Sequence, residues 1–194
     1  MSTDEPEDPI LAASRAVLIG EPEKVDVVVG DYDARWPERF EIERAKIAAA
    51  LGQRARAIEH IGSTSVPGLA AKPIIDICLV VYDSSDEASY VPDLSAAGYE
   101  LRVREPEWHE HRMLRTPERD VHIHVFTDGS TEISRHLLFR DWLRGNEADR
   151  ESYQETKRRL AQEDWPTMQH YAEAKSEVVE AIMSRALDAG ATSS

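Results

Sequence analysis

A single aspartate lies inside an otherwise apolar, strand-length segment of this 194-residue chain. The segment IIDICLVV, residues 74–81, has the length and the β-branched residues of a largely buried strand. Side chains alternate along a strand, so Asp76 and Cys78 share one face and the flanking isoleucines lie on the other. An ionised carboxylate is costly there unless it is paired or bound to a metal. Asp76 is therefore either part of a structural salt bridge or hydrogen-bonded pair, or a functional residue.

The rest of the chain alternates segments typical of strands with segments typical of helices. The predicted strands are residues 25–29, 55–61, 74–81, 99–103, 111–116 and 120–126, and the predicted helices are residues 10–19, 36–51, 86–97, 131–144, 147–162 and 167–187. This order indicates an α/β (α+β) fold, with a mixed β-sheet flanked by helices and a helical C-terminal region. We expect an acidic, flexible tail over residues 1–24, a single domain over residues 25–188 and a frayed end over residues 189–194.

Charge and cysteine content exclude several classes of function. The chain has 37 Asp and Glu against 23 Lys and Arg, a net charge of −14, whereas surfaces that bind long nucleic acids are basic. A local cluster of cations can still bind a small anion. One cysteine allows neither an internal disulfide nor a cysteine zinc cluster, and we expect it to be an inert core thiol. There is no apolar run long enough for a membrane span and no basic, apolar leader, so we expect a cytoplasmic protein.

A loop rich in glycine and serine precedes the Asp76 strand. At the end of the predicted strand 55–61, the residues Gly62, Ser63, Thr64 and Ser65 offer backbone N–H groups and hydroxyls that suit phosphate oxygens. Lys72 near the end of the loop would add a cation, or else is an ordinary exposed lysine. Turns often have the same composition, so a phosphate site and a plain turn both fit this segment.

Alternating histidines mark a second polar strand face. In DVHIHVF, residues 120–126, His122 and His124 share one face. If this strand neighbours the Asp76 strand, the three side chains form a mixed carboxylate–imidazole site, which favours zinc, manganese or iron over magnesium. His60, just before the loop, is a further candidate ligand. The alternatives are a general acid or base, or histidines that are simply hydrogen-bonded beside a wet cleft.

Two C-terminal segments repeat the pattern Tyr-x-x-x-Lys. YQETKRRL at 153–160 and YAEAKSEV at 171–178 place Lys157 and Lys175 within apolar helix stripes. An ammonium in such a stripe reaches solvent along its stem, forms an internal salt bridge or meets an anion. In the functional interpretation, these lysines and Arg140 converge over the cleft and bind a phosphorylated or carboxylated ligand.

Two histidines are expected to face solvent, and one helix face has that as an alternative. His109 and His111 lie in the charged segment EPEWHEHR. His136, Arg140 and Arg144 recur every four residues on one predicted helix, which is also typical of an ordinary solvated helix face.

HIGSTSVPGLAAKPIIDI, together with HIHVF at 122–126, FRDWLR at 139–144 and YAEAK at 171–175, resembles the GrpB family. The resemblance covers about residues 25–187 and implies a polymerase-beta-like nucleotidyltransferase fold. Similar domains are fused to dephospho-CoA kinase in some bacteria, which implies a functional link to that enzyme. Such a resemblance implies fold more firmly than activity.

The resemblance also implies roles for particular residues. Nucleotidyltransferases of this type bind the triphosphate on a Gly-Ser loop and hold two divalent metals on three carboxylates. Gly62, Ser63 and Asp76 match that pattern, whereas Cys78 occupies the place of the second carboxylate, and an uncharged thiol is a poor magnesium ligand. His122 and His124 stand where the third carboxylate is expected.

Three functions therefore stay open. The first is a nucleotidyltransferase-like enzyme that binds a nucleotide or another phosphorylated small molecule, with magnesium, manganese or zinc held by Asp76 and the two strand histidines. The second is a catalytically inactive module that binds a ligand or a partner protein. The third is a metal- or histidine-dependent hydrolase.

Overall fold

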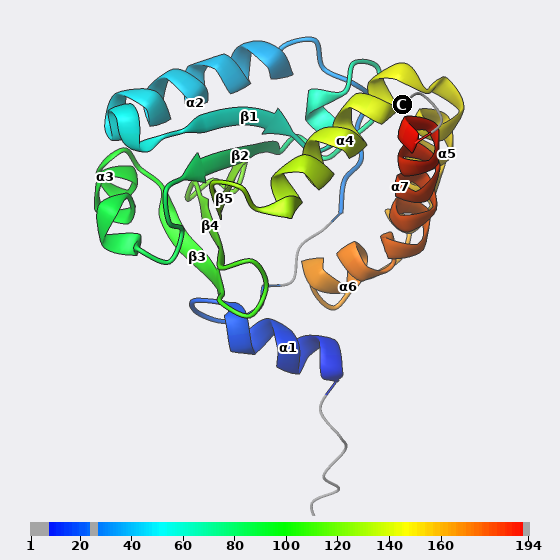
Figure 1. Cartoon of the computed structure of the whole chain (residues 1–194). Coiled ribbons are helices and arrows are strands. Elements are labelled where there is room, and N and C mark those ends of the chain that lie inside the picture. The colour runs from blue at the N-terminus through cyan, green and yellow to red at the C-terminus, as the bar shows by residue number, and fades with distance from the viewer. Residues whose placement is uncertain (1–7, 24–26, 192–194) are drawn as a thin grey trace, which may run out of the picture.

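The computed structural model describes residues 8–23 and 27–191. They form one five-stranded sheet and the helices around it (Figure 1). The strands are β1 (Ala57–Ile61), β2 (Ile75–Val81), β3 (Glu100–Glu105), β4 (His111–Arg115) and β5 (Val121–Thr127). They lie side by side in the order β1-β2-β5-β4-β3. β2 and β5 are parallel and the other neighbouring pairs are antiparallel. The predicted mixed sheet is confirmed, and the predicted strands 55–61, 74–81, 99–103, 111–116 and 120–126 correspond to β1–β5.

Helices cover both faces of the sheet and form the C-terminal region, as predicted. They are α1 (Pro9–Val17), α2 (Trp36–Leu51), α3 (Val91–Ala96), α4 (Thr131–Gly145), α5 (Glu147–Leu160), α6 (Met168–Glu173) and α7 (Ser176–Ala191). α2 and α3 pack on one face and α4 on the other. α4, α5 and α7 enclose a smaller core around the loop that follows β1.

The alternation predicted for β2 places its two faces in different surroundings. Ile75, Ile77 and Leu79 are fully buried beneath α2. Cys78 is buried on the opposite face, in a small cluster with the apolar side of α4. Asp76 is on that second face as well, and its side chain is 28% exposed. β2 thus has one face that builds the core and one that carries a polar group to the site.

The predicted helix 86–97 begins later than expected. A short 3-10 turn, Glu87–Ser89, comes first, and α3 starts at Val91 with Pro92 in its first turn. A proline deeper in a helix would lack its N–H donor and would clash with the preceding turn, so the helix starts just before Pro92. The predicted helix 167–187 is divided into α6 and α7, and no glycine or proline marks the division.

The predicted strand 25–29 is not found over residues 27–29, the part of it that the structure describes. Residues 25 and 26 lie outside the described residues, and residues 27–29 have no regular structure. Gly30 forms an isolated bridge with Ala71 instead. The chain therefore passes alongside the end of the loop without joining the sheet.

The N-terminal helix is docked on the domain. α1 contacts α6 and β3, Leu18 bridges Val103 on β3, and Asp8 lies 2.8 Å from Nε2 of His170 on α6. Within the predicted tail, residues 1–7 and 24 lie outside the described residues. α7 continues to Ala191, beyond the predicted domain end at residue 188.

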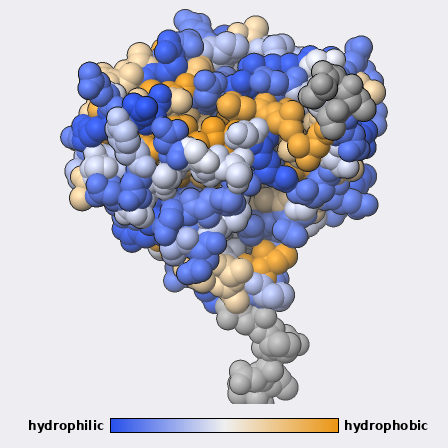
Figure 2. All heavy atoms as spheres, viewed as in Figure 1, coloured by the Kyte–Doolittle hydropathy of each residue, from blue (hydrophilic) through white to orange (hydrophobic). Residues whose placement is uncertain are grey.

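The face of the molecule in Figure 2 is mostly hydrophilic, with apolar residues gathered over α4 and α7. Among the described residues, no helix is both long and apolar enough to cross a membrane.

Candidate functional site

Two neighbouring strands bring together three candidate metal-ligating residues, Asp76, His122 and His124. Because β2 and β5 pair in parallel, Asp76 lies opposite His122, and His124 follows two residues along the same face. Nδ1 of His122 is 3.6 Å from Oδ1 of Asp76, and Nε2 of His124 is 3.7 Å from the same oxygen. All three side chains are about one quarter exposed, so they are accessible to a ligand. We call these three residues the Asp–His cluster.

The spacing within the Asp–His cluster suits a bound metal ion. One ligand atom from each residue can be chosen so that all three lie within 4.8 Å of one another. The two nitrogen–oxygen distances of 3.6 and 3.7 Å are too long for good hydrogen bonds. A tetrahedral ion with bonds of about 2.1 Å separates its ligands by about 3.4 Å. One carboxylate and two imidazoles form a donor set for zinc, manganese or iron.

The charge of Asp76 is stabilised by its neighbours. Burial alone would raise the pKa of this carboxyl, but interactions with His122 and His124 outweigh burial and hold the pKa below its ordinary value. Asp76 is therefore ionised at neutral pH, which is the form that binds metals.

Gly62 allows the loop to approach Asp76 closely. Its φ of +67° lies in the left-handed region that favours glycine. A Cβ at this position would overlap the carboxylate of Asp76 and come within 2.9 Å of its Cβ. The loop backbone thus lies directly against the Asp–His cluster because residue 62 has no side chain.

The hydroxyls of the loop have different tasks. Ser65 donates to the carbonyl of Gly62 at 2.6 Å, and Thr64 donates to the carbonyl of Ile74 at 2.9 Å, so both hydroxyls hold the loop in shape. Ser63 instead accepts a hydrogen bond from Lys157. Among the described residues, the backbone N–H groups of Ser63 and Thr64 have no hydrogen-bond acceptor. These two N–H groups are the part of the loop that is free to contact an anion.

Three lysines gather next to this loop. Nζ of Lys157 lies 4.7 Å from the ring centroid of Tyr153, and Nζ of Lys175 lies 4.5 Å from that of Tyr171. Lys72 approaches the same Tyr171 ring at 5.1 Å. The repeated Tyr-x-x-x-Lys pattern therefore builds two similar cation–aromatic contacts, one on α5 and one at the junction of α6 and α7. We call Lys72, Lys157 and Lys175 the lysine group.

Hydrogen bonds fix two members of the lysine group. Lys157 is 3% exposed and donates to Ser63 Oγ at 2.9 Å and to the carbonyl of Ala70. Lys72 donates to the thioether sulphur of Met168 at 2.8 Å. Within the described ranges, no member of the lysine group forms an ion pair with a carboxylate. Lys157 is buried and Lys72 and Lys175 are half-buried, so an anion would stabilise the charges of this group.

The surroundings of the lysine group lower the pKa values of its three members. Burial, followed by the charges of Lys175 and Lys72, lowers the pKa of Lys157 to about 7. Burial and the Lys175 charge lower the pKa of Lys72 to about 8, and burial lowers that of Lys175. The Asp76 carboxylate acts in the opposite direction on all three lysines. The lysine group and the Asp–His cluster therefore influence each other electrostatically.

The low pKa of Lys157 predicts a pH-dependent stability. Above pH 7 the folded protein has lost this proton while the unfolded chain keeps it to about pH 10.4, so stability rises with pH across this window. Relative to Lys157→Met, the free energy of unfolding of the parent should rise by about 2 kcal/mol between pH 7 and 9. Urea unfolding at several pH values measures this difference.

Lys46→Met is the matched control, because Lys46 also lies over a tyrosine ring, at 4.6 Å from Tyr99, but is 41% exposed. Its stability difference from the parent should stay constant over the same pH range. A constant difference for Lys157→Met as well would contradict the low pKa.

Arg140 does not join the lysine group. Its guanidinium donates to Glu59 at 2.9 Å, to Asp141 at 2.8 Å and to the carbonyl of His60 at 3.1 Å, so its charge is already paired. Arg144 on the same helix donates to the carbonyl of Ser65. The alternative of an ordinary solvated face of α4 therefore does not hold for Arg140, whose side chain is 12% exposed, whereas Arg144 is 41% exposed.

His60 does not join the Asp–His cluster. In the β1–β2 pairing it lies opposite Ile77, which puts its side chain on the core face of the sheet. Its ring stacks on Phe40 at 4.6 Å, and Nε2 is 3.0 Å from Oγ1 of Thr64. Burial lowers the pKa of His60 to about 4. His60 thus holds the loop through Thr64, and its expected place among the metal ligands is not supported.

His111 is the residue that the sequence interpretation missed. It was expected in solvent, but it is only 5% exposed, and burial lowers its pKa. Its Nε2 lies 3.1 Å from Nδ1 of His124, and its Nδ1 lies 2.6 Å from Oε2 of Glu105. The signal in the sequence is the alternation of β4, which places His111 and Met113 on the face that also carries His124.

Cys78 is an inert core thiol, as expected. It is fully buried, and burial raises its pKa to about 12. At neutral pH this thiol is neither a nucleophile nor a metal ligand.

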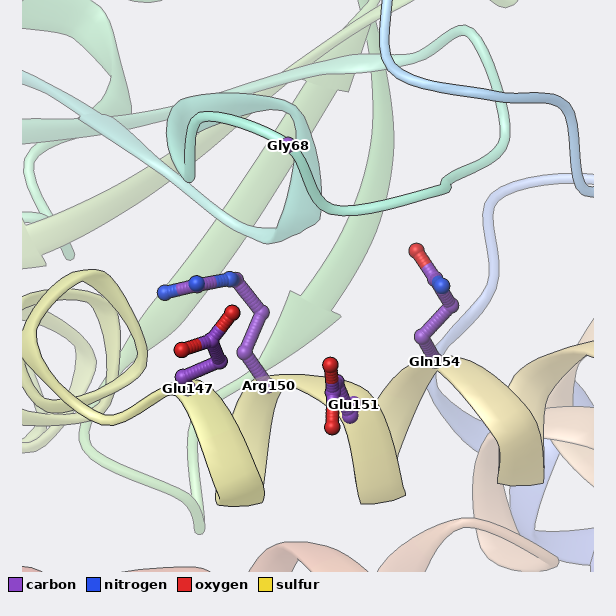
Figure 3. Close-up of a pocket in the computed structure, with 5 residues that line it drawn as sticks. All are labelled: Gly68, Glu147, Arg150, Glu151 and Gln154. Atoms are coloured by element: carbon purple, nitrogen blue, oxygen red, sulfur yellow. The ribbon is translucent and has the colours of Figure 1, made fainter.

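A surface pocket elsewhere on the loop is a poorer candidate. Gly68 and four residues of α5 line it, namely Glu147, Arg150, Glu151 and Gln154 (Figure 3). Two carboxylates in the lining disfavour an anion, and Gln154 already accepts a hydrogen bond from the backbone of Ala70. No member of the Asp–His cluster or the lysine group lines this pocket.

The fold and the site together define a small α/β protein with a carboxylate–histidine cluster beside a loop and three lysines. Residues 26–185 match the family described as GrpB protein. The chain belongs to the GrpB family, and the resemblance found in the sequence is confirmed.

Known relatives support this assignment. UPF0157 protein BH1888 of Halalkalibacterium halodurans is 54% identical over 172 residues, which are 88% of each chain. The crystal structure of conserved protein GrpB from Enterococcus faecalis covers 83% of this chain and 98% of that chain, with 35% identity and a TM-score of 0.74. A structure of the Cid1 poly(U) polymerase is a weaker match, with 12% identity, 70% of this chain, 43% of that chain and a TM-score of 0.39.

Proposed function

We propose that this protein binds a nucleotide or another phosphorylated small molecule together with a divalent metal, and transfers a group of that ligand. The observation that carries the proposal is the position of the lysine group, which has no carboxylate partner among the described residues, beside the Asp–His cluster. Gly62 contacts Asp76, and the next residue, Ser63, accepts a hydrogen bond from Lys157. One short loop thus connects donors for phosphate oxygens with ligands for a metal.

Each part of the site has a distinct task in this proposal. The lysine group and the free N–H groups of the loop would neutralise and orient phosphate oxygens. Asp76, His122 and His124 would hold the metal, which when bound supplies a Lewis acid for a phosphoryl oxygen. A bound anion would also raise the pKa of Lys157 from about 7, so that ligand binding takes up a proton near neutral pH.

Thermal and urea unfolding with manganese, pyrophosphate or ATP test the proposal. A ligand at a hundredfold excess over its Kd should stabilise the parent by about 2.7 kcal/mol. Lys157→Met should lose the stabilisation by pyrophosphate and ATP while it keeps the stabilisation by manganese, because Lys157 is not a ligand of the metal.

Lys46→Met controls for the loss of one positive charge and should respond as the parent does. The proposal fails if neither phosphate compound stabilises the parent with manganese present, or if Lys157→Met responds to both as strongly as the parent.

The second candidate function is a binding module without catalysis. The observation that favours it is Cys78, which is buried and apolar at the position where nucleotidyltransferases are expected to carry a second metal carboxylate. A module would show the same stabilisation by ligand but no consumption of ATP with any acceptor. Incubation of the metal-loaded protein with ATP, alone and with a panel of hydroxyl and amine acceptors, followed by chromatography of the nucleotides, separates the two candidates.

A further inference from the structure

Three neighbouring strands carry a continuous chain of polar side chains that ends at the Asp–His cluster. Glu105 is on β3, His111 on β4 and His124 on β5. Oε2 of Glu105 is 2.6 Å from Nδ1 of His111, and Nε2 of His111 is 3.1 Å from Nδ1 of His124. At the far end, Nε2 of His124 is 3.7 Å from Asp76.

The chemistry of these groups fixes where each proton lies. An ionised carboxylate only accepts hydrogen bonds, so Nδ1 of His111 must carry the hydrogen that it shares with Glu105. In neutral His111 the other nitrogen, Nε2, is then an acceptor, so Nδ1 of His124 is the donor between the two rings. Neutral His124 is left with a lone pair on Nε2, the atom that points toward Asp76.

We propose that Glu105 and His111 are positioning residues that hold His124 in its Nδ1–H tautomer, with the Nε2 lone pair directed at the metal position of the Asp–His cluster. The tautomer follows from the hydrogen-bond chain alone, whereas its use for a metal rests on the proposed function. Histidines that bind transition metals commonly donate their other N–H to such an outer partner, which orients the ring and raises its basicity. This hydrogen-bonded row of side chains therefore favours binding of zinc or manganese to the His124 nitrogen over binding of magnesium, because magnesium prefers oxygen ligands.

The packing of His111 supports this role. Its ring is stacked on Phe126 at 4.9 Å and contacts Trp108 edge-on at 5.1 Å. These two aromatic contacts and the two hydrogen bonds to Glu105 and His124 together hold the His111 ring in one orientation. His111 therefore presents a fixed acceptor to His124 rather than a mobile polar group.

Long-range proton–nitrogen NMR of the metal-free protein at pH 7.5 tests the tautomer directly. In the parent, His124 should show a protonated Nδ1 and a bare Nε2. In His111→Phe, Nδ1 of His124 loses its acceptor, so the ring should change to the Nε2–H tautomer and donate to Asp76. Glu105→Gln is a milder variant that keeps His111 and should give a mixture of tautomers. An Nε2–H tautomer of His124 in the parent overturns the proposal.

Calorimetric titration with zinc, manganese and magnesium tests the consequence for the metal. Loss of such an outer partner should weaken zinc and manganese binding by about 10–100-fold. His111→Phe binding zinc as tightly as the parent overturns the selection of the metal. If the parent shows the expected tautomer and binds none of the three metals, the proposed metal function fails while the positioning of His124 stands.

Discussion

Asp76→Asn should weaken zinc and manganese binding by about 100-fold or more, which exceeds the usual effect of losing an outer-shell partner. Asp76 supplies the one negative charge of the Asp–His cluster, and its Oδ1 is the atom that both histidines face. Asparagine keeps the size and shape that fit against Gly62 but removes the charge that attracts a cation. Isothermal titration of the metal-free proteins at pH 7 measures the loss.

Asp120→Asn is a suitable control for this experiment. Asp120 directly precedes β5, but its carboxylate is paired with Arg39 at 2.7 Å and bonded to Thr116 at 2.7 Å. Its replacement should leave the metal affinity unchanged. An affinity of Asp76→Asn within about threefold of the parent, which is about 0.7 kcal/mol, would exclude Asp76 as a metal ligand.

Gly62→Ala should lower the free energy of unfolding by about 3 kcal/mol. Part of the loss, roughly 1–3 kcal/mol, comes from a side chain at φ +67° and ψ −175°, a combination that is almost exclusive to glycine. The remainder comes from overlap with Asp76, whose Cβ lies 2.9 Å from the added methyl group and belongs to a central strand that cannot easily move. Urea unfolding at pH 7 measures the total.

Gly68→Ala is the comparison variant without a clash, because Gly68 is in the same loop, has a φ of +79° and has no atom within 4 Å of the position of an added Cβ. It should lose only the backbone part, about 1–2 kcal/mol. Equal losses for the two variants would show that the close approach to Asp76 adds nothing to the strain at Gly62.

The pattern of β2 and β5 was sufficient to predict which side chains share a face, because alternation is a local property of a strand. That the two strands are neighbours was an expectation from the family resemblance, and the parallel pairing confirms it. The repeat that contains Lys157 and Lys175 was also visible, because a helix places residues four apart on one side.

Residues with long-range surroundings were harder to predict. His111 lies in a charged segment, and its burial depends on Phe126 and Trp108, which a local pattern does not connect. Arg140 has the spacing of a solvated helix face, but the sheet beneath α4 is itself polar at Glu59. In both cases the polarity of the residue is visible in the sequence, but its partner lies on an element that is distant in the sequence or that no local pattern connects to it.

The parallel pairing of β2 with β5 also constrains the order of folding. A parallel pair cannot be closed by a tight turn, and here residues 82–120, with α3, β3 and β4, lie between the two strands. Contacts between residues so distant in sequence form slowly, because a long loop must close first. Asp76 therefore meets His122 and His124 only by a contact between residues that are more than forty positions apart in sequence. A newly made chain that ends before β5 has Asp76 without either histidine, so the Asp–His cluster cannot form until β5 has been made.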